Sequence, residues 1–78
     1  MEQMFSKRHY RIDRSQIAYL RFILESYDGL AFMSTLDNRE ALIEISYPPS
    51  RQADAEALLS ALAAEVAMTQ VSAPDLHR

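Results

Sequence analysis

The chain has 78 residues, of which 49% are hydrophobic and 24% charged, and it contains one glycine and no cysteine. This size and composition predict one small globular domain over residues 1–78, with a core at about 8–72 and a flexible tail at 73–78. The absence of cysteine excludes disulfides, thiolate nucleophiles and cysteine-held zinc. Phosphate-binding and dinucleotide-binding loops are excluded as well, because they need several glycines.

The net charge of −3 is unevenly distributed along the chain. Residues 1–25 carry five Lys or Arg against three acids, whereas the remainder carries three Arg against eight acids. A basic amino-terminal strand on an acidic body can meet an anion or an acidic face of another subunit, although a solvated polar strand is the simpler interpretation. The first eleven residues do not resemble a signal peptide, and no apolar run approaches the roughly 20 residues of a membrane span, so we expect a cytoplasmic protein.

Residues 8–12 alternate in the manner of a short strand, and a helix that runs to about Tyr27 follows it. Asp13 is placed to cap this helix, with Ser15 as the alternative cap. Gly29 lies where a helix needs a residue of left-handed conformation in order to stop. The predicted buried stripe of the helix consists of Ile17, Leu20, Ile23, Leu24 and Tyr27.

The second half of the chain predicts a hairpin, a helix and a last strand. Residues 30–36 and 41–47 are the expected arms of the hairpin, joined by turn-forming residues. Two prolines end the second arm, and Ser50 is expected to cap the helix that follows. Residues 68–72 predict the last strand. The predicted buried stripe of the second helix consists of Ala55, Leu58, Leu59, Leu62 and Val66.

This order of elements predicts an α+β fold of the ferredoxin-like βαββαβ type, a two-layer sandwich with an antiparallel four-stranded sheet. Right-handed crossovers place both helices on one face of the sheet, with the first and third strands at its centre. We expect Tyr10, Ile12, Ile43 and Ile45 to face the helices. The open face is then expected to show Lys7, His9, Arg11, Ala31, Met33, Thr35, Leu42, Glu44 and Ser46.

Two surfaces predict an interaction partner. Tyr19 and Phe22 point away from the buried stripe of the first helix, and two aromatics on an outer helix face are typical of a contact surface. The open sheet face mixes apolar and charged side chains, which favours pairing with another sheet. We therefore expect a homodimer through one of these surfaces. The interface candidates are Tyr19, Phe22, Met33, Leu42, His9 and Arg11.

The start of the first helix is the candidate ligand site. Asp13, Arg14 and Ser15 lie there, and the free N–H groups of a helix amino terminus attract a small anion. A plain helix cap is the simpler interpretation of the same residues.

Other chemistry finds little support in the sequence. His9 and His77 are far apart and no ligand spacing is present, so we expect no metal and no cofactor. RNA-recognition modules carry exposed aromatics on their first and third strands, and here those positions hold His9, Arg11, Leu42 and Glu44, which disfavours nucleic acid. No combination of nucleophile, base and acid is evident, so we expect that the protein is not an enzyme.

The segment from Tyr10 to Ala31, YRIDRSQIAYLRFILESYDGLA, and the turn at Leu36-Asp37 resemble a family of short uncharacterised bacterial proteins over roughly residues 8–66. This resemblance implies a compact bacterial domain of unknown function and transfers no functional residue. A looser similarity of fold to ACT-type regulatory domains implies subunits that pair through strands or helices and bind amino acids between them. The expected function is a dimeric ligand-sensing or regulatory module, and the alternative is a protein-interaction subunit.

Overall fold

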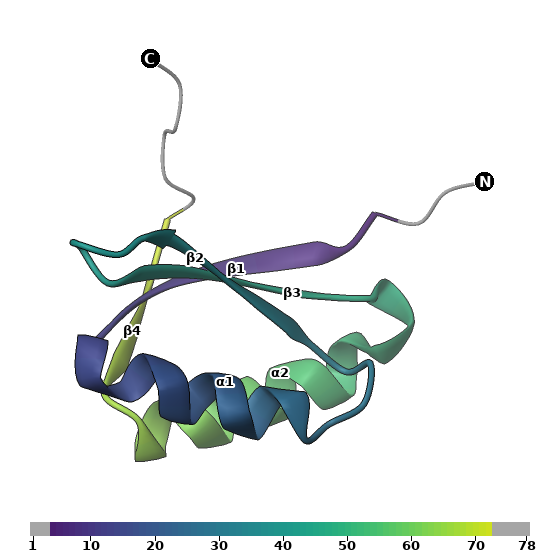
Figure 1. The fold of residues 1–78 in the computed structure, drawn as a ribbon. Coiled ribbons are helices and arrows are strands. Elements are labelled where there is room, and N and C mark those ends of the chain that lie inside the picture. Colours follow the sequence, from purple (N-terminus) through teal and green to yellow (C-terminus); the bar gives the residue numbers. More distant parts are fainter. Residues whose placement is uncertain (1–3, 73–78) are drawn as a thin grey trace.

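The computed structural model describes residues 4–72, which form an antiparallel four-stranded sheet with two helices against one face (Figure 1). The strands are β1 (Ser6–Ile12), β2 (Phe32–Asp37), β3 (Leu42–Tyr47) and β4 (Met68–Val71). The helices are α1 (Ile17–Glu25) and α2 (Gln52–Glu65), each preceded by a 3-10 turn, η1 (Arg14–Gln16) or η2 (Pro49–Arg51).

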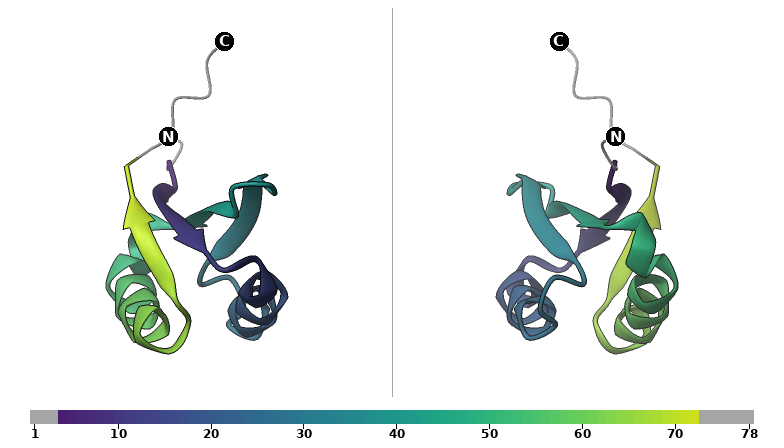
Figure 2. Two further views of the ribbon diagram at one scale, coloured as in Figure 1. Left: turned by 90° about the vertical axis from the view of Figure 1, so that its left-hand side faces the viewer. Right: turned by 90° about the vertical axis from the view of Figure 1, so that its right-hand side faces the viewer.

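The sheet order is β2-β3-β1-β4, so the first and third strands lie at the centre, as expected, and β2 and β4 are the edges. Figure 2 shows α1 on the β2 side of the sheet and α2 on the β4 side. Within residues 4–72, the opposite face of the sheet carries no helix (Figure 1).

The register between β1 and β3 decides which side chains enter the core. Tyr10 lies opposite Ile43, and Arg8 lies opposite Ile45, so these residues point toward the helices. His9 lies opposite Glu44 and therefore points to the open face. The expected faces of both central strands are confirmed.

The core fills the space between the sheet and the helices. The expected stripe of α2 is confirmed, and in α1 Leu20 and Leu24 are fully buried. Tyr27 was expected in the stripe of α1, but it lies beyond the end of the helix and is 45% exposed. The buried core residues are Tyr10, Ile12, Leu20, Leu24, Leu30, Ala31, Ala41, Ile43, Ile45, Tyr47, Ala55, Leu59, Leu62, Val66 and Met68.

The carboxyl end of α1 and the amino end of α2 differ from the expectation. α1 stops at Glu25, and the chain reaches Gly29 through a further turn in which the Leu30 N–H donates to the Tyr27 carbonyl at 3.1 Å. Gly29 adopts a φ of 72°, so its predicted left-handed conformation is confirmed. The expected cap Ser50 lies within η2, whose own cap position is Pro48, and the cap position of α2 is Arg51, which makes no capping bond with its side chain. A second proline then starts η2, where its fixed φ suits the first helical turn.

A polar cluster joins the sheet to α2 and was not predicted from the sequence. The Arg8 guanidinium lies 3.3 Å from a Glu56 carboxylate oxygen, and the Tyr47 hydroxyl donates to the same oxygen at 3.1 Å. Because Arg8 shares the helix-facing side of β1 with core residues, its charge needs this partner. The pair fixes α2 beneath the central strands.

The conformation at Gly29 generates a prediction about stability. No atom lies within 4 Å of the position that a Cβ would take there, so Gly29→Ala creates no clash and tests the backbone alone. A left-handed alanine costs about 1 kcal/mol, so we expect the free energy of unfolding in urea to fall by that amount. Gly29→Asn is the matched control and should lose less, because asparagine enters this conformation more readily. Equal stability of the wild type and the alanine variant would contradict this explanation of the turn.

Candidate functional site

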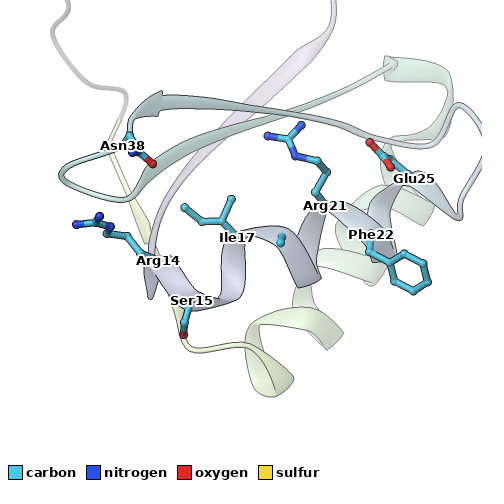
Figure 3. Close-up of a pocket in the computed structure, with 8 residues that line it drawn as sticks. Arg14, Ser15, Ile17, Arg21, Phe22, Glu25 and Asn38 are labelled. Carbon is cyan, nitrogen blue, oxygen red and sulfur yellow. The ribbon is translucent and has the colours of Figure 1, made fainter.

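The larger of two adjoining hollows on the surface runs along the outer face of α1, beneath the β2–β3 turn (Figure 3). It is an open groove of about 620 Å³. Figure 3 shows Arg14 and Asn38 at one end of the groove, Phe22 and Glu25 at the other, and Arg21 between them. The lining residues are Arg14, Ser15, Ile17, Ala18, Arg21, Phe22, Glu25 and Asn38.

A second hollow of about 260 Å³ continues this groove toward the start of β2. Arg21 and Glu25 line both hollows, and Phe32 and Met33 line the second one only. The side chains of α1 and the start of β2 therefore form one surface, which we call the α1–β2 surface. It is defined by the residues that line the two hollows.

Exposed aromatic side chains mark this surface. Phe22 is 71% exposed and Phe32 is 49% exposed, and each lines one of the two hollows. Phe22 was predicted as an interface residue, and the structure leaves it exposed. Large apolar groups so open to water are costly unless a partner covers them.

The arginines of the groove are free of ion pairs within the described residues. Neither Arg14 nor Arg21 lies within 4.0 Å of a carboxylate oxygen in residues 4–72. The spacing of Arg21 and Glu25 allows a pair along the helix, but none forms there. Both guanidiniums remain available to a partner.

Asp13 and Ser15 form a helix cap, the simpler of the two interpretations offered by the sequence. The Asp13 carboxylate accepts hydrogen bonds from the Ser15 backbone N–H at 2.9 Å and from the Ser15 hydroxyl at 2.8 Å. These bonds hold the pKa of the Asp13 carboxyl below its ordinary value, with the backbone bond the larger cause. An anion at this helix start would meet a carboxylate, so of the three candidate ligand residues Arg14 alone is a free cation facing the groove.

The predicted open face of β2 is wrong. Met33 lies opposite Ile45 and packs against the core, so it points toward the helices and not toward the open face. Thr35 faces the same way, because it lies opposite Ile43. The open face instead carries Phe32, whose ring centroid lies 5.8 Å from that of Phe5.

The other interface candidates on the sheet are either buried or paired with side chains of the same chain. Leu42 lies on the open face opposite Arg11, as predicted, but it is only 7% exposed and offers little contact area. His9 Nε2 lies 3.1 Å from Glu44 Oε2, and Arg11 Nη1 lies 3.1 Å from Glu40 Oε1. A cross-strand pair is therefore the observed role of His9.

Tyr19 also has a partner within the chain. Its hydroxyl donates to Glu65 Oε2 at 2.6 Å, which ties α1 to the end of α2. This bond raises the pKa of the tyrosine above its ordinary value. Of the two aromatics predicted as an interface on α1, Tyr19 bridges the helices and Phe22 stays free.

Comparison with known proteins identifies the family. Residues 10–66 match the model of the family described as Domain of unknown function (DUF4911). The chain belongs to this family. No curated protein and no solved structure gives a significant match. The family match covers the start of the groove and the whole of α1 and β2, so the α1–β2 surface lies entirely within the family's domain.

No group of three or more His, Cys, Asp or Glu in residues 4–72 is arranged to hold a metal ion. None of the helices in this part of the chain has the length and apolar character needed to cross a bilayer. His77 of the expected tail lies outside the described residues.

The sequence missed three residues of the surface. These are Glu25, Asn38 and Phe32, none of which was a candidate site residue. Asn38 reaches the groove only because the β2–β3 hairpin passes over α1. A signal for Phe32 was available in Phe5, since two aromatics on one sheet face can pair across strands.

The cap at Asp13 predicts how the stability of the fold depends on pH. A lowered carboxyl pKa in the folded state stabilises the fold above the ordinary range of aspartate, and that contribution is lost as the pH falls through the folded-state pKa. We expect Asp13→Ala to melt below the wild type at pH 7, with the gap in Tm narrowing below about pH 4. Asp13→Asn keeps a capping oxygen without the charge, so its Tm should exceed that of the alanine variant by an amount that does not depend on pH. A gap that stays constant down to pH 2 would contradict the role of the charged cap.

Proposed function

We propose that this domain is a non-enzymatic protein-binding module of ferredoxin-like topology, and that the α1–β2 surface is its binding site. The observation that carries the proposal is the exposure of Phe22 beside a groove whose arginines have no ion-pair partner in residues 4–72. Exposed aromatics and arginines are the residues that contribute most to protein interfaces. The sheet order, with β1 and β3 central and both helices on one side, supports the ferredoxin-like assignment.

The shape of the surface favours a protein over a small molecule. The groove is open along its length, whereas small-molecule sites enclose most of their ligand. The surface extends from η1 past α1 to the start of β2, which suits a broad partner. A partner can contact Phe22 and the start of β2 together, and a single small ligand in one hollow cannot.

The chemistry of the groove supports a role in binding and not in catalysis. Glu25 is the single carboxylate of the main groove, and Ser15 is its single hydroxyl. That hydroxyl donates to Asp13, which is engaged as a helix cap. General acid and base catalysis needs a proton donor and acceptor within reach of one another, and the lining offers no such pair.

Photo-crosslinking tests the proposed binding surface. Phe22 is replaced by p-benzoylphenylalanine in the full chain, and the same residue replaces Ala57, an exposed alanine of α2, as the control. We expect covalent conjugates from position 22 on irradiation in cells, and none from position 57, because the benzophenone reacts only with a chain that contacts it. An absence of conjugates at position 22, or equal yields at both positions, would reject the α1–β2 surface.

A second candidate function is ligand sensing of the ACT-like regulatory kind. Arg14 and Arg21, which form no ion pair within the described part of the chain, line the groove together with the apolar Ile17 and Ala18. This favours ligand sensing, because a carboxylate with an apolar body matches both features. The ligand class is then an organic acid or an amino acid.

Thermal shift measurements test this second candidate. We expect millimolar carboxylates from acetate to octanoate to raise Tm, with a larger rise for longer chains as more apolar surface is buried. Arg14→Gln and Arg21→Gln should each reduce the rise, and Arg39→Gln is the matched control because Arg39 does not line the groove. Amino acids are screened in the same way. No rise in Tm with any compound would remove ligand sensing from consideration.

A further inference from the structure

We propose that the partner of the α1–β2 surface is a second copy of this chain, joined by antiparallel pairing of β2 with β2 about a two-fold axis. This inference rests on the proposed function, because it names the occupant of the same surface. Pairing of the edges would produce one continuous eight-stranded sheet with the two α1 helices side by side beneath it.

The β2 edge is suited to strand pairing. β2 has six residues, Asp37 at its last position is its only charge, and no proline interrupts it. As an edge strand it leaves one row of backbone N–H and C=O groups without a sheet partner among residues 4–72. Edge strands that do not pair with another chain are usually short, charged, bulged or broken by proline. In β2 the only such features are the bulge between Thr35 and Asp37 and the charge of Asp37, both near its end. β4, the other edge, is shorter, with four residues.

The position of α1 makes the surface complementary to itself. α1 lies on the β2 side of the sheet, so a two-fold axis at the middle of β2 places it antiparallel to its copy. Arg21 and Glu25 lie one turn apart on the outer face of α1 and are unpaired within the described residues. Across the axis each Arg21 can meet the Glu25 of the other copy, and this ion pair forms twice.

The apolar side chains complete the argument for a second copy. Phe22 lies between Arg21 and Glu25 in the sequence and is 71% exposed, so antiparallel α1 helices would cover it on both subunits. A purely acidic partner would satisfy Arg14 and Arg21 but would be repelled by Glu25. A second copy supplies both signs of charge as well as the apolar contact. A domain of this size also has a modest core, which association extends.

The edge contact is tested first by oligomeric state. Sedimentation equilibrium of the full chain should show a dimer at micromolar concentration. Ser34 is exposed at the middle of β2 on the open face, so Ser34→Lys places two positive charges close to the axis and should weaken the dimer by about tenfold or more. Gln70→Lys adds a lysine at an exposed position of the β4 edge, there on the helix-facing side, and should leave the dimer intact.

The helix contact is tested by exchanging charges. Arg21→Glu and Glu25→Arg should each weaken dimerisation by about tenfold, because each turns two attractive pairs into repulsive ones. The double variant R21E/E25R restores opposite charges across the axis and should regain the affinity of the wild type. Circular dichroism of each variant confirms that the fold is retained, since all of these positions are exposed.

Each outcome decides between the proposals. A wild type that remains monomeric at high micromolar concentration overturns the dimer, as does a dimer that responds to Gln70→Lys and not to Ser34→Lys. Single charge variants that weaken the dimer without recovery in the double variant also overturn the α1 contact. Conjugates from position 22 at a mass other than twice that of the chain, with a monomeric wild type, would leave the proposed function standing and reject the second copy.

Discussion

The antiparallel pairing of β1 with β3 is the constraint on which the rest of the structure depends. Its register sets Tyr10 opposite Ile43 and His9 opposite Glu44, so one face of the central sheet is apolar and the other polar. A shift by one residue would exchange these faces and expose the whole core. Because the apolar face must be covered, both helices lie against it, and the polar face stays open. Arg8 is the exception on the inner face, and Glu56 of α2 compensates for its charge.

The same arrangement leaves the two sides of the domain unequal. On the β4 side, α2 is tied to the sheet by the cluster around Glu56 and to α1 by the bond from Tyr19. On the β2 side, η1 and α1 carry Arg14 and Arg21, which have no ion-pair partner in residues 4–72, and an exposed Phe22 lies beside the longer edge strand. The surface offered to a partner therefore arises where the two-layer packing ends, and no separate binding element is needed to explain it.

Prediction from the sequence succeeded where one physical signal dominated. Alternation in β3 and the stripe of α2 each have one strongly apolar face, so their orientation could be read directly. In β2 neither face is strongly polar, and Met33 was placed on the wrong side because alternation alone does not say which set points inward. Residues of the groove that come from separate elements, such as Asn38 and Glu25, could not be grouped, since their distance in space depends on the packing of the hairpin over α1.

The sequence by itself determined the order of the elements, the cap at Asp13 and the turn at Gly29, because these depend on local hydrogen bonds and backbone conformation. It also determined which residues of α2 and of the central strands are buried in the core, since burial follows the period of the apolar residues. Only the tertiary structure decided that Tyr19 binds Glu65, that Arg8 pairs with Glu56, and that Phe22 stays exposed beside the groove. These outcomes depend on contacts between residues far apart in the chain, and the pattern along a single segment carries no information about them.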